Sequence, residues 1–336
     1  VDWDGDGWPL DVAGVPDEGA DCDDEDATLN RDDADGDGFD SCEGDCEDTT
    51  SAFGPEVVED CTDGIDQNCD GVADGNDECP CGQLAAGTLH TCGLHSSGSV
   101  ECWGGDWEGQ ASPPATEFVL LAAGSNLTCG VTTTGTLECW GDDTHGQASP
   151  PAGTFDRVAC GGNFACGVAT TAEIECWGEG SAWGQTAPPA GSFSEVGTGS
   201  LHACALAVSG GVECWGYAFY GQATPPGGSF EQISVGANHT CGIVGGAVQC
   251  WGYDADGQSS PPTGTFAQVA GGGNHTCALT AGSEVQCWGS NAYGESSPPA
   301  GSFAQVTAGN GHSCALTTTG EVECWGRNDY GQSTPP

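Results

Sequence analysis

Short segments in which apolar and polar side chains alternate recur along most of the chain. Residues 312–316 (HSCAL) and 322–325 (VECW) form one such pair, and the Thr/Gly segment between them is typical of a hairpin turn. When the two segments are aligned as antiparallel strands with their apolar positions opposed, Cys314 falls opposite Cys324. The pattern therefore predicts hairpins that each hold two cysteines face to face.

This hairpin belongs to a repeat of about 37 residues that occurs seven times. Each copy has Cys-Trp-Gly, a variable loop and Gly-Gln or Gly-Glu, and all but the last continue with Pro-Pro, Phe and an apolar-Gly segment. Units this small must stack to bury their apolar faces, and a closed ring removes exposed strand edges. We therefore predict an all-β fold, a seven-bladed β-propeller over residues 82–336. Because the first copy lacks the Pro-Pro and Phe that precede the others, we expect the two ends together to close one blade. The Cys-Trp-Gly triplets begin at residues 102, 139, 176, 214, 250, 287 and 324.

The opposed cysteines are predicted to form disulfides within the blades. Directly opposed residues of a non-hydrogen-bonded antiparallel pair lie about 4.5 Å apart at Cα, which is near the lower end of disulfide geometry. Zinc would need four converging ligands, and the ten-residue spacing does not resemble a CxxC knuckle. The predicted pairs are Cys92 with Cys102, Cys129 with Cys139, Cys166 with Cys176, Cys204 with Cys214, Cys241 with Cys250, Cys277 with Cys287, and Cys314 with Cys324.

The repeat resembles the propeller repeats of the regulator of chromosome condensation family, through motifs such as HTCALTAGSEVQCWGSNAYGE at 275–295. The cysteine pair and the short period are most similar to the extracellular crinkly-type repeats of plant receptor kinases and to secreted bacterial relatives. The resemblance covers residues 82–336 and implies a binding scaffold. It does not carry over nucleotide-exchange activity.

Composition changes at Cys79-Pro80-Cys81-Gly82, where we place a domain boundary. Residues 1–81 hold 29 of the 50 acidic residues and seven of the 22 cysteines, whereas all seven histidines follow. The net charge of −47 argues against nucleic acid as a partner, because such partners need a basic surface. Dense cysteine indicates an oxidising compartment. With no apolar run that could span a membrane and no initial methionine, we expect a secreted or cell-surface protein whose leader was removed.

The acidic region, residues 1–81, contains three segments with the pattern of a calcium loop. Such a loop places oxygen ligands at positions 1, 3 and 5, a glycine at 6 and a backbone carbonyl at 7. Only the third segment has acids at positions 9 and 12. In the first two segments, the closing ligand would have to come from acidic residues that follow the loop. The alternative is a solvated acidic linker with turn-forming Asp-Gly pairs. The predicted ligands are Asp2, Asp4, Asp6, Trp8, Asp23 and Asp24; Asp33, Asp35, Asp37, Phe39 and Asp48; and Asp66, Asn68, Asp70, Val72, Asp74 and Asp77.

This region resembles an Asp/Cys-rich metal-binding module of secreted bacterial proteins, some described as copper-binding, through DGDGF, DCED and EDCTDGIDQNCDGVAD. Copper prefers imidazole and sulfur, and the region has neither histidine nor methionine. We therefore expect structural Ca²⁺ in a small, irregular, disulfide-rich calcium-loop region that precedes the propeller. Calcium should also stabilise its fold, because the packed carboxylates repel one another until a cation binds.

The remaining candidate chemistry favours binding over catalysis. No repeat assembles a nucleophile, a base and an oxyanion donor, so we expect no enzyme activity. Five histidines share one repeat position, which is Leu127 and Phe164 in the other two copies, so a structural histidine satisfied by backbone is favoured over a metal ring. In the loops after Cys-Trp-Gly, four aromatic residues fall outside the repeat pattern and are candidate partner-binding residues: Trp107, Tyr217, Phe219 and Tyr253.

These observations predict a secreted, calcium-stabilised binding or adhesion protein. Its propeller would present a protein or glycan ligand site at the rim. The alternative is a self-assembling subunit of an extracellular fibre or surface layer, in which the N-terminal segment docks on a neighbouring propeller.

Cys160 has no counterpart in the other repeats. It stands where Ala86, Ala123 and Ala308 stand in theirs, and its blade offers no partner. Cys160 and the seven cysteines of the acidic region together make eight, an even number that would allow all of them to pair. We therefore hypothesise a disulfide from Cys160 to an N-terminal cysteine, with Cys79 or Cys81 favoured.

Overall fold

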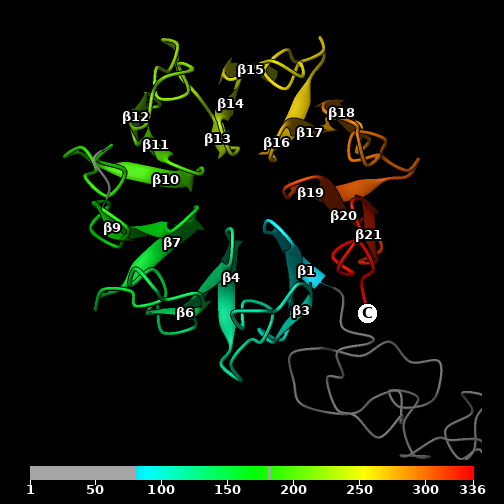
Figure 1. Ribbon diagram of the computed structural model, residues 1–336. Coiled ribbons are helices and arrows are strands. Elements are labelled where there is room, and N and C mark those ends of the chain that lie inside the picture. Colours follow the sequence, from blue (N-terminus) through cyan, green and yellow to red (C-terminus); the bar gives the residue numbers. More distant parts are fainter. Residues whose placement is uncertain (1–80, 181–182) are drawn as a thin grey trace, which may run out of the picture. The chain divides into compact units, whose positions relative to one another are not determined.

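The computed structural model describes residues 81–180 and 183–336, and these form a ring of small antiparallel sheets (Figure 1). The ring has seven blades, and each blade is a three-stranded sheet whose strands follow one another in sequence. The described residues contain no helix that is long and apolar enough to cross a membrane. The predicted all-β, seven-bladed propeller is therefore confirmed. Its blades comprise β1 (Cys81–Ala86), β2 (His90–His95) and β3 (Val100–Gly104); β4 (Phe118–Ala123), β5 (Leu127–Thr132) and β6 (Leu137–Gly141); β7 (Phe155–Cys160), β8 (Phe164–Ala169) and β9 (Ile174–Gly178); β10 (Phe193–Thr198), β11 (His202–Ala207) and β12 (Val212–Gly216); β13 (Gln232–Val235), β14 (His239–Val244) and β15 (Ala247–Gly252); β16 (Phe266–Gly271), β17 (His275–Thr280) and β18 (Val285–Gly289); and β19 (Phe303–Ala308), β20 (His312–Thr317) and β21 (Val322–Gly326).

The middle strand of each blade is the most deeply buried, because neighbours cover it on both edges and both faces. In β5 and β20 every residue is buried. Its cysteine lies directly opposite the cysteine of the third strand, and all seven predicted pairs are bonded, with Cα separations of 4.0 to 4.1 Å. Each disulfide thus joins two strands that are already neighbours in a local hairpin.

The Gly-Gln or Gly-Glu motif after each Cys-Trp-Gly joins one blade to the next. In the first copy Gly109 has a φ of 83°, which favours glycine, and the Gln110 side chain accepts the backbone N–H of Glu108. The Gln110 carbonyl in turn accepts a hydrogen bond from Thr128 of the following blade. The loop is therefore a connector that holds two blades together.

The C-terminal copy of this connector completes the ring. The backbone carbonyl of Gln332 accepts hydrogen bonds from Thr91 and from the indole of Trp103, both in the first blade. The structure thus refines the expectation that both termini build one blade: the strands of each blade come from a single repeat, and the C-terminus supplies only the connector that the first repeat lacks.

A ring of backbone hydrogen bonds closes the propeller at its centre. After each inner strand a glycine carbonyl or a neighbouring carbonyl accepts an N–H from the adjacent blade, ending with the Asn310 N–H to the Gly87 carbonyl at 3.3 Å. The glycine is required by close approach, because a Cβ on Gly87 would lie 2.6 Å from the Gly124 oxygen. The same constraint holds at the equivalent glycines of the other blades, which explains why glycine ends every apolar-Gly segment.

Candidate functional site

Five buried histidines lie between the blades, where each bonds to a hydroxyl of the next blade. His239 is fully buried, and its Nε2 lies 2.8 Å from Oγ1 of Thr276. That hydroxyl donates to the Gln258 carbonyl at 2.9 Å, so it must accept from the ring, and Nε2 carries the proton. The expectation of a structural histidine therefore needs a correction: the partner of the ring is a side chain of the neighbouring blade and not the backbone. The equivalent bonds join His90 to Thr128, His202 to Thr240, His275 to Ser313 and His312 to Thr91.

Desolvation keeps these histidines neutral. The pKa of His239 is lowered to about 3, chiefly by burial and to a smaller extent by His275 and His202, whereas Asp254 opposes the shift. Burial likewise lowers the pKa of His90 to about 4. Where the histidine is replaced, the following blade has an alanine at the position of the hydroxyl: Leu127 packs in one cluster with Ala165, and Phe164 in another with Ala203. The residues at these two facing positions are therefore matched in polarity: histidine faces a hydroxyl side chain, and leucine or phenylalanine faces alanine.

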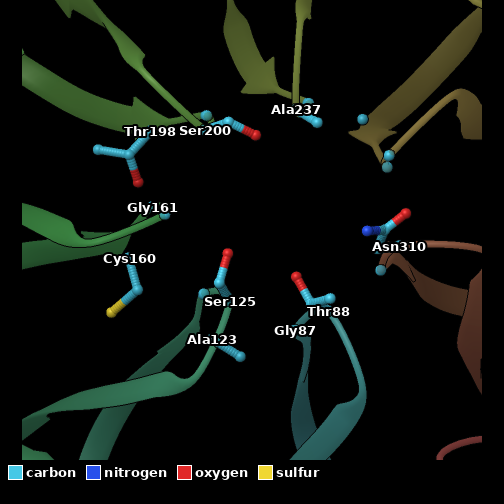
Figure 2. Close-up of a pocket in the computed structure, with 18 of the residues that line it drawn as sticks. Gly87, Thr88, Ala123, Ser125, Cys160, Gly161, Thr198, Ser200, Ala237 and Asn310 are labelled. Carbon is cyan, nitrogen blue, oxygen red and sulfur yellow. The ribbon is translucent and has the colours of Figure 1, made fainter. Parts of the chain in front are cut away.

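Cys160 lies beside one opening of the central channel, a cavity of about 220 Å³ (Figure 2). The hydroxyls of Thr88, Ser125 and Ser200 and the side-chain nitrogen of Asn310 point into this opening, whereas the thiol of Cys160 points away from it. Among the residues drawn there, no charged side chain faces the channel. The opening is therefore lined with neutral hydroxyl, amide and backbone groups.

The structure contradicts the disulfide predicted for Cys160. Its thiol is free and only 7% exposed, packed with Leu127 and Val158 in the core between the second and third blades. Burial raises the pKa of this thiol well above its ordinary range. The prediction failed because it was based on an even number of remaining cysteines, and that number does not indicate the direction in which a side chain points. Cys81 also has a free thiol; it occupies the repeat position of Phe118, and burial followed by the charge of Glu101 raises its pKa to about 11.

The four predicted partner-binding residues divide between two aromatic groups on the loops after Cys-Trp-Gly. Tyr217, Phe219 and Tyr253 lie in one group, with Phe219 78% exposed. Trp107 is 58% exposed and belongs elsewhere, because it packs edge-on against Tyr330 with ring centroids 4.6 Å apart.

Two further aromatics, Trp183 and Tyr220, complete the first group. Trp183 packs on Tyr217 of the next blade at 4.8 Å between centroids, and Tyr220 packs on Tyr253 of the blade after at 4.9 Å. Phe219 contacts Tyr220 at 5.1 Å. We call these five residues, Trp183, Tyr217, Phe219, Tyr220 and Tyr253, the aromatic rim surface. Trp183 and Tyr220 each precede the loop glycine, and each packs edge-on against the first loop residue of the following blade. These contacts could have been predicted from the sequence only if the arrangement of neighbouring blades had been known.

An arginine occupies the corresponding position in the last blade. The guanidinium carbon of Arg327 lies 5.3 Å from the ring centroid of Tyr293 and 5.9 Å from that of Tyr330. Its Nε also bonds to Asp329 at 2.7 Å. The rim thus already contains one cation held between two tyrosines and a carboxylate.

The structure tests no predicted metal site. The calcium ligands proposed between Asp2 and Asp77 lie outside the described residues. Within the described residues, no group of three or more histidine, cysteine, aspartate or glutamate side chains could hold a metal ion.

Comparison with known proteins identifies repeats of a known family in the propeller. The model of the regulator of chromosome condensation (RCC1) repeat matches residues 118–147, 266–295 and 303–332. No curated protein matches the sequence.

Among solved structures, the ectodomain of the Physcomitrella patens receptor kinase CR4 is 25% identical, with a TM-score of 0.64 and coverage of 74% of both chains. The CRINKLY WD40 ectodomain of the Arabidopsis thaliana receptor kinase ACR4 is also 25% identical, with a TM-score of 0.63, and the match covers 74% of this chain and 98% of that one. Prp20p from Saccharomyces cerevisiae, 16% identical with a TM-score of 0.59 over 68% of this chain and 80% of that one, shares the fold. The disulfides and the likeness to receptor ectodomains indicate an extracellular propeller. The C-terminal region of this chain is therefore a disulfide-rich β-propeller built from repeats of the regulator of chromosome condensation type.

Proposed function

We propose that this protein is a secreted, non-enzymatic binding protein that recognises a partner protein through the aromatic rim surface. The observation that carries the proposal is the unbroken contact chain from Trp183 through Tyr217 and Tyr220 to Tyr253, which spans three successive blades. Exposed aromatics that support one another in this way are typical of binding hot spots, because they bury a large area at little entropic cost. Tyr217 and Tyr253 serve as the base, and Phe219 and Trp183 as the exposed anchors.

Charge favours a partner that carries arginine or lysine. The chain has a net charge of −47 with only three arginines and no lysine, so cationic partners are attracted and acidic ones repelled. Arg327 between Tyr293 and Tyr330 is an internal example of the contact we expect, a guanidinium against the rim aromatics. We propose that Ca²⁺ stabilises the acidic N-terminal region and leaves the recognition surface to the propeller.

The test is a pull-down of native surface material with the full chain and its variants, followed by calorimetry with each identified partner. Phe219→Ser and Trp183→Ser should each weaken binding by about 10-fold or more, as expected for hot-spot anchors. Val208→Ser is a matched control, because Val208 is 68% exposed but lies in a hairpin turn outside the aromatic rim surface. Equal binding by all three variants would refute the assignment of this surface. Open-ended polymers in light scattering would favour the fibre alternative.

A further inference from the structure

Side-chain amides clamp the inner strands of neighbouring blades together. The Gln232 side chain accepts the backbone N–H of Val269 at 2.9 Å and donates to the carbonyl of the same residue at 3.5 Å. Gln83 bonds in the same way to both backbone groups of Leu121, at 2.9 and 3.1 Å. A glutamine of one blade thus satisfies the outward backbone groups of the next.

The clamp recurs at five of the seven blade junctions. Gln305 reaches both backbone groups of Leu84, whereas Gln268 accepts the Val306 N–H and Glu195 accepts the Ile233 N–H. All five side chains occupy one repeat position, the third residue from Phe, or from Cys81 in the first copy. The position therefore requires a hydrogen-bond acceptor that faces the backbone of the next blade.

Two adjacent blades depart from this rule. Leu120 and Arg157 occupy the clamp position in the second and third blades, facing Val158 and Val196 of the blades that follow. Leucine has no polar atom, and arginine carries only donors, so neither side chain can accept an amide N–H. In the described part of the chain, no side-chain hydrogen bond reaches the backbone of Val158 or Val196. These two strand edges are therefore the unclamped ones of the ring.

Both unclamped edges line one cavity of about 470 Å³, together with Leu120, Arg157 and Glu195. The cavity lies at the ends of the inner strands opposite to the opening drawn in Figure 2. The lining also includes Gln83, whose side chain bonds to both backbone groups of Leu121. This glutamine lies beside the two unclamped edges, and its hydrogen bonds show the geometry that a bound ligand would adopt there.

We propose that this cavity is a binding site for a ligand that presents a carboxamide or peptide amide to Val158 and Val196. The amide oxygen would accept the strand N–H and the amide nitrogen would donate to the strand carbonyl, as Gln83 and Gln232 do inside the protein. The guanidinium of Arg157 adds donors for a second carbonyl of the ligand. The site belongs to the channel and is separate from the aromatic rim surface.

The lining favours a neutral amide over a carboxylate or a cation. A carboxylate would match the strand N–H groups and Arg157, but it would also face the strand carbonyls and Glu231, which repel it. A cation cannot accept the N–H groups that lack a partner. Burial raises the pKa of Glu195 to about 7 despite the hydrogen bond from Ile233 and the charge of Arg157, so this group can also donate to an amide oxygen when protonated.

The experiment is an amide-proton NMR titration of the full chain with N-acetyl-glutaminamide. We expect saturable shifts at Val158 and Val196 and little change at the clamped Val269, which serves as the internal control. Dimethyl glutarate, which keeps carbonyl acceptors but has no amide N–H, should bind at least several-fold more weakly. Absence of saturable shifts at Val158 and Val196, or equal shifts with both compounds, would overturn the proposal.

Variants that restore or remove a clamp complete the test. Leu120→Gln and Arg157→Gln copy the residue of the other blades, so each should fold and should abolish the response at the amide it covers. Gln268→Leu should do the reverse and make the Val306 amide respond to the ligand. Undiminished binding by the Leu120→Gln, Arg157→Gln double variant would show that the ligand does not occupy the clamp positions and would refute the assignment.

Discussion

The paired position between blades allows a quantitative prediction at His239 and Thr276. His239→Leu removes the 2.8 Å hydrogen bond and leaves a buried hydroxyl without its donor, which should cost about 1–3 kcal/mol of unfolding free energy. Thr276→Ala leaves the Nε2–H of a fully buried ring without an acceptor and should cost a similar amount. The double variant removes both polar groups and recreates the pairing of Leu127 with Ala165 that the second and third blades already use.

The double variant should therefore be more stable than the two single costs predict. We expect a coupling free energy of about 1–2 kcal/mol, well above the ~0.3–0.5 kcal/mol scatter of independent sites. For a domain of this size each kcal/mol corresponds to about 2–4 °C in Tm. Differential scanning calorimetry with the disulfides intact measures the cycle. If the unfolding free energy lost in the double variant equals the sum of the two single losses, the idea that the two residues must match in polarity is refuted.

Three further predictions concern pH, chelation and thiol reactivity. The folded pKa of His90 is lowered to about 4 from about 6.5 in the unfolded chain, so below pH 6.5 the unfolded state binds the proton first and stability should fall from pH 6.5 to pH 4. The loss should be on the order of 1 kcal/mol per pH unit for each of the five histidines, measured by denaturant melts, and a flat profile would contradict it. Chelation of calcium should make residues 1–81 sensitive to protease and leave the propeller intact, because only the acidic region has calcium-loop patterns; unchanged digestion would count against calcium there. The Cys160 thiol should resist alkylation in the folded protein and react only after unfolding, as burial and its raised pKa imply; mass spectrometry would detect the adduct, and rapid native labelling would show that the core between the second and third blades is open.

Much of the fold was predictable because its signals are local. Cys314 and Cys324 are only ten residues apart in one hairpin, so alternation and turn chemistry were enough to set its register. The same reasoning placed all seven disulfides. The aromatic rim surface was predictable in part, since variable loops showed where exposed aromatics stand but not which of them touch.

Contacts between blades could not be predicted from one repeat. Leu120 and Arg157 look like ordinary variation along the sequence, and only their position opposite Val158 and Val196 shows that an acceptor is missing. Cys160 looked like half of a disulfide until its side chain was seen to face the second blade. In each case the deciding neighbour lies a whole repeat away.

By itself, the sequence determined the number of blades, their strands and their disulfides, because alternation, turns and a fixed period act within a few tens of residues. Only the tertiary structure decided which side chains meet across the blade junctions, because those partners are brought together by closure of the ring. The histidine and hydroxyl pairs, the glutamine clamps and the edge-on aromatic contacts all belong to this second class. They share one physical cause: each blade leaves polar and apolar groups on its face that only the next blade can satisfy.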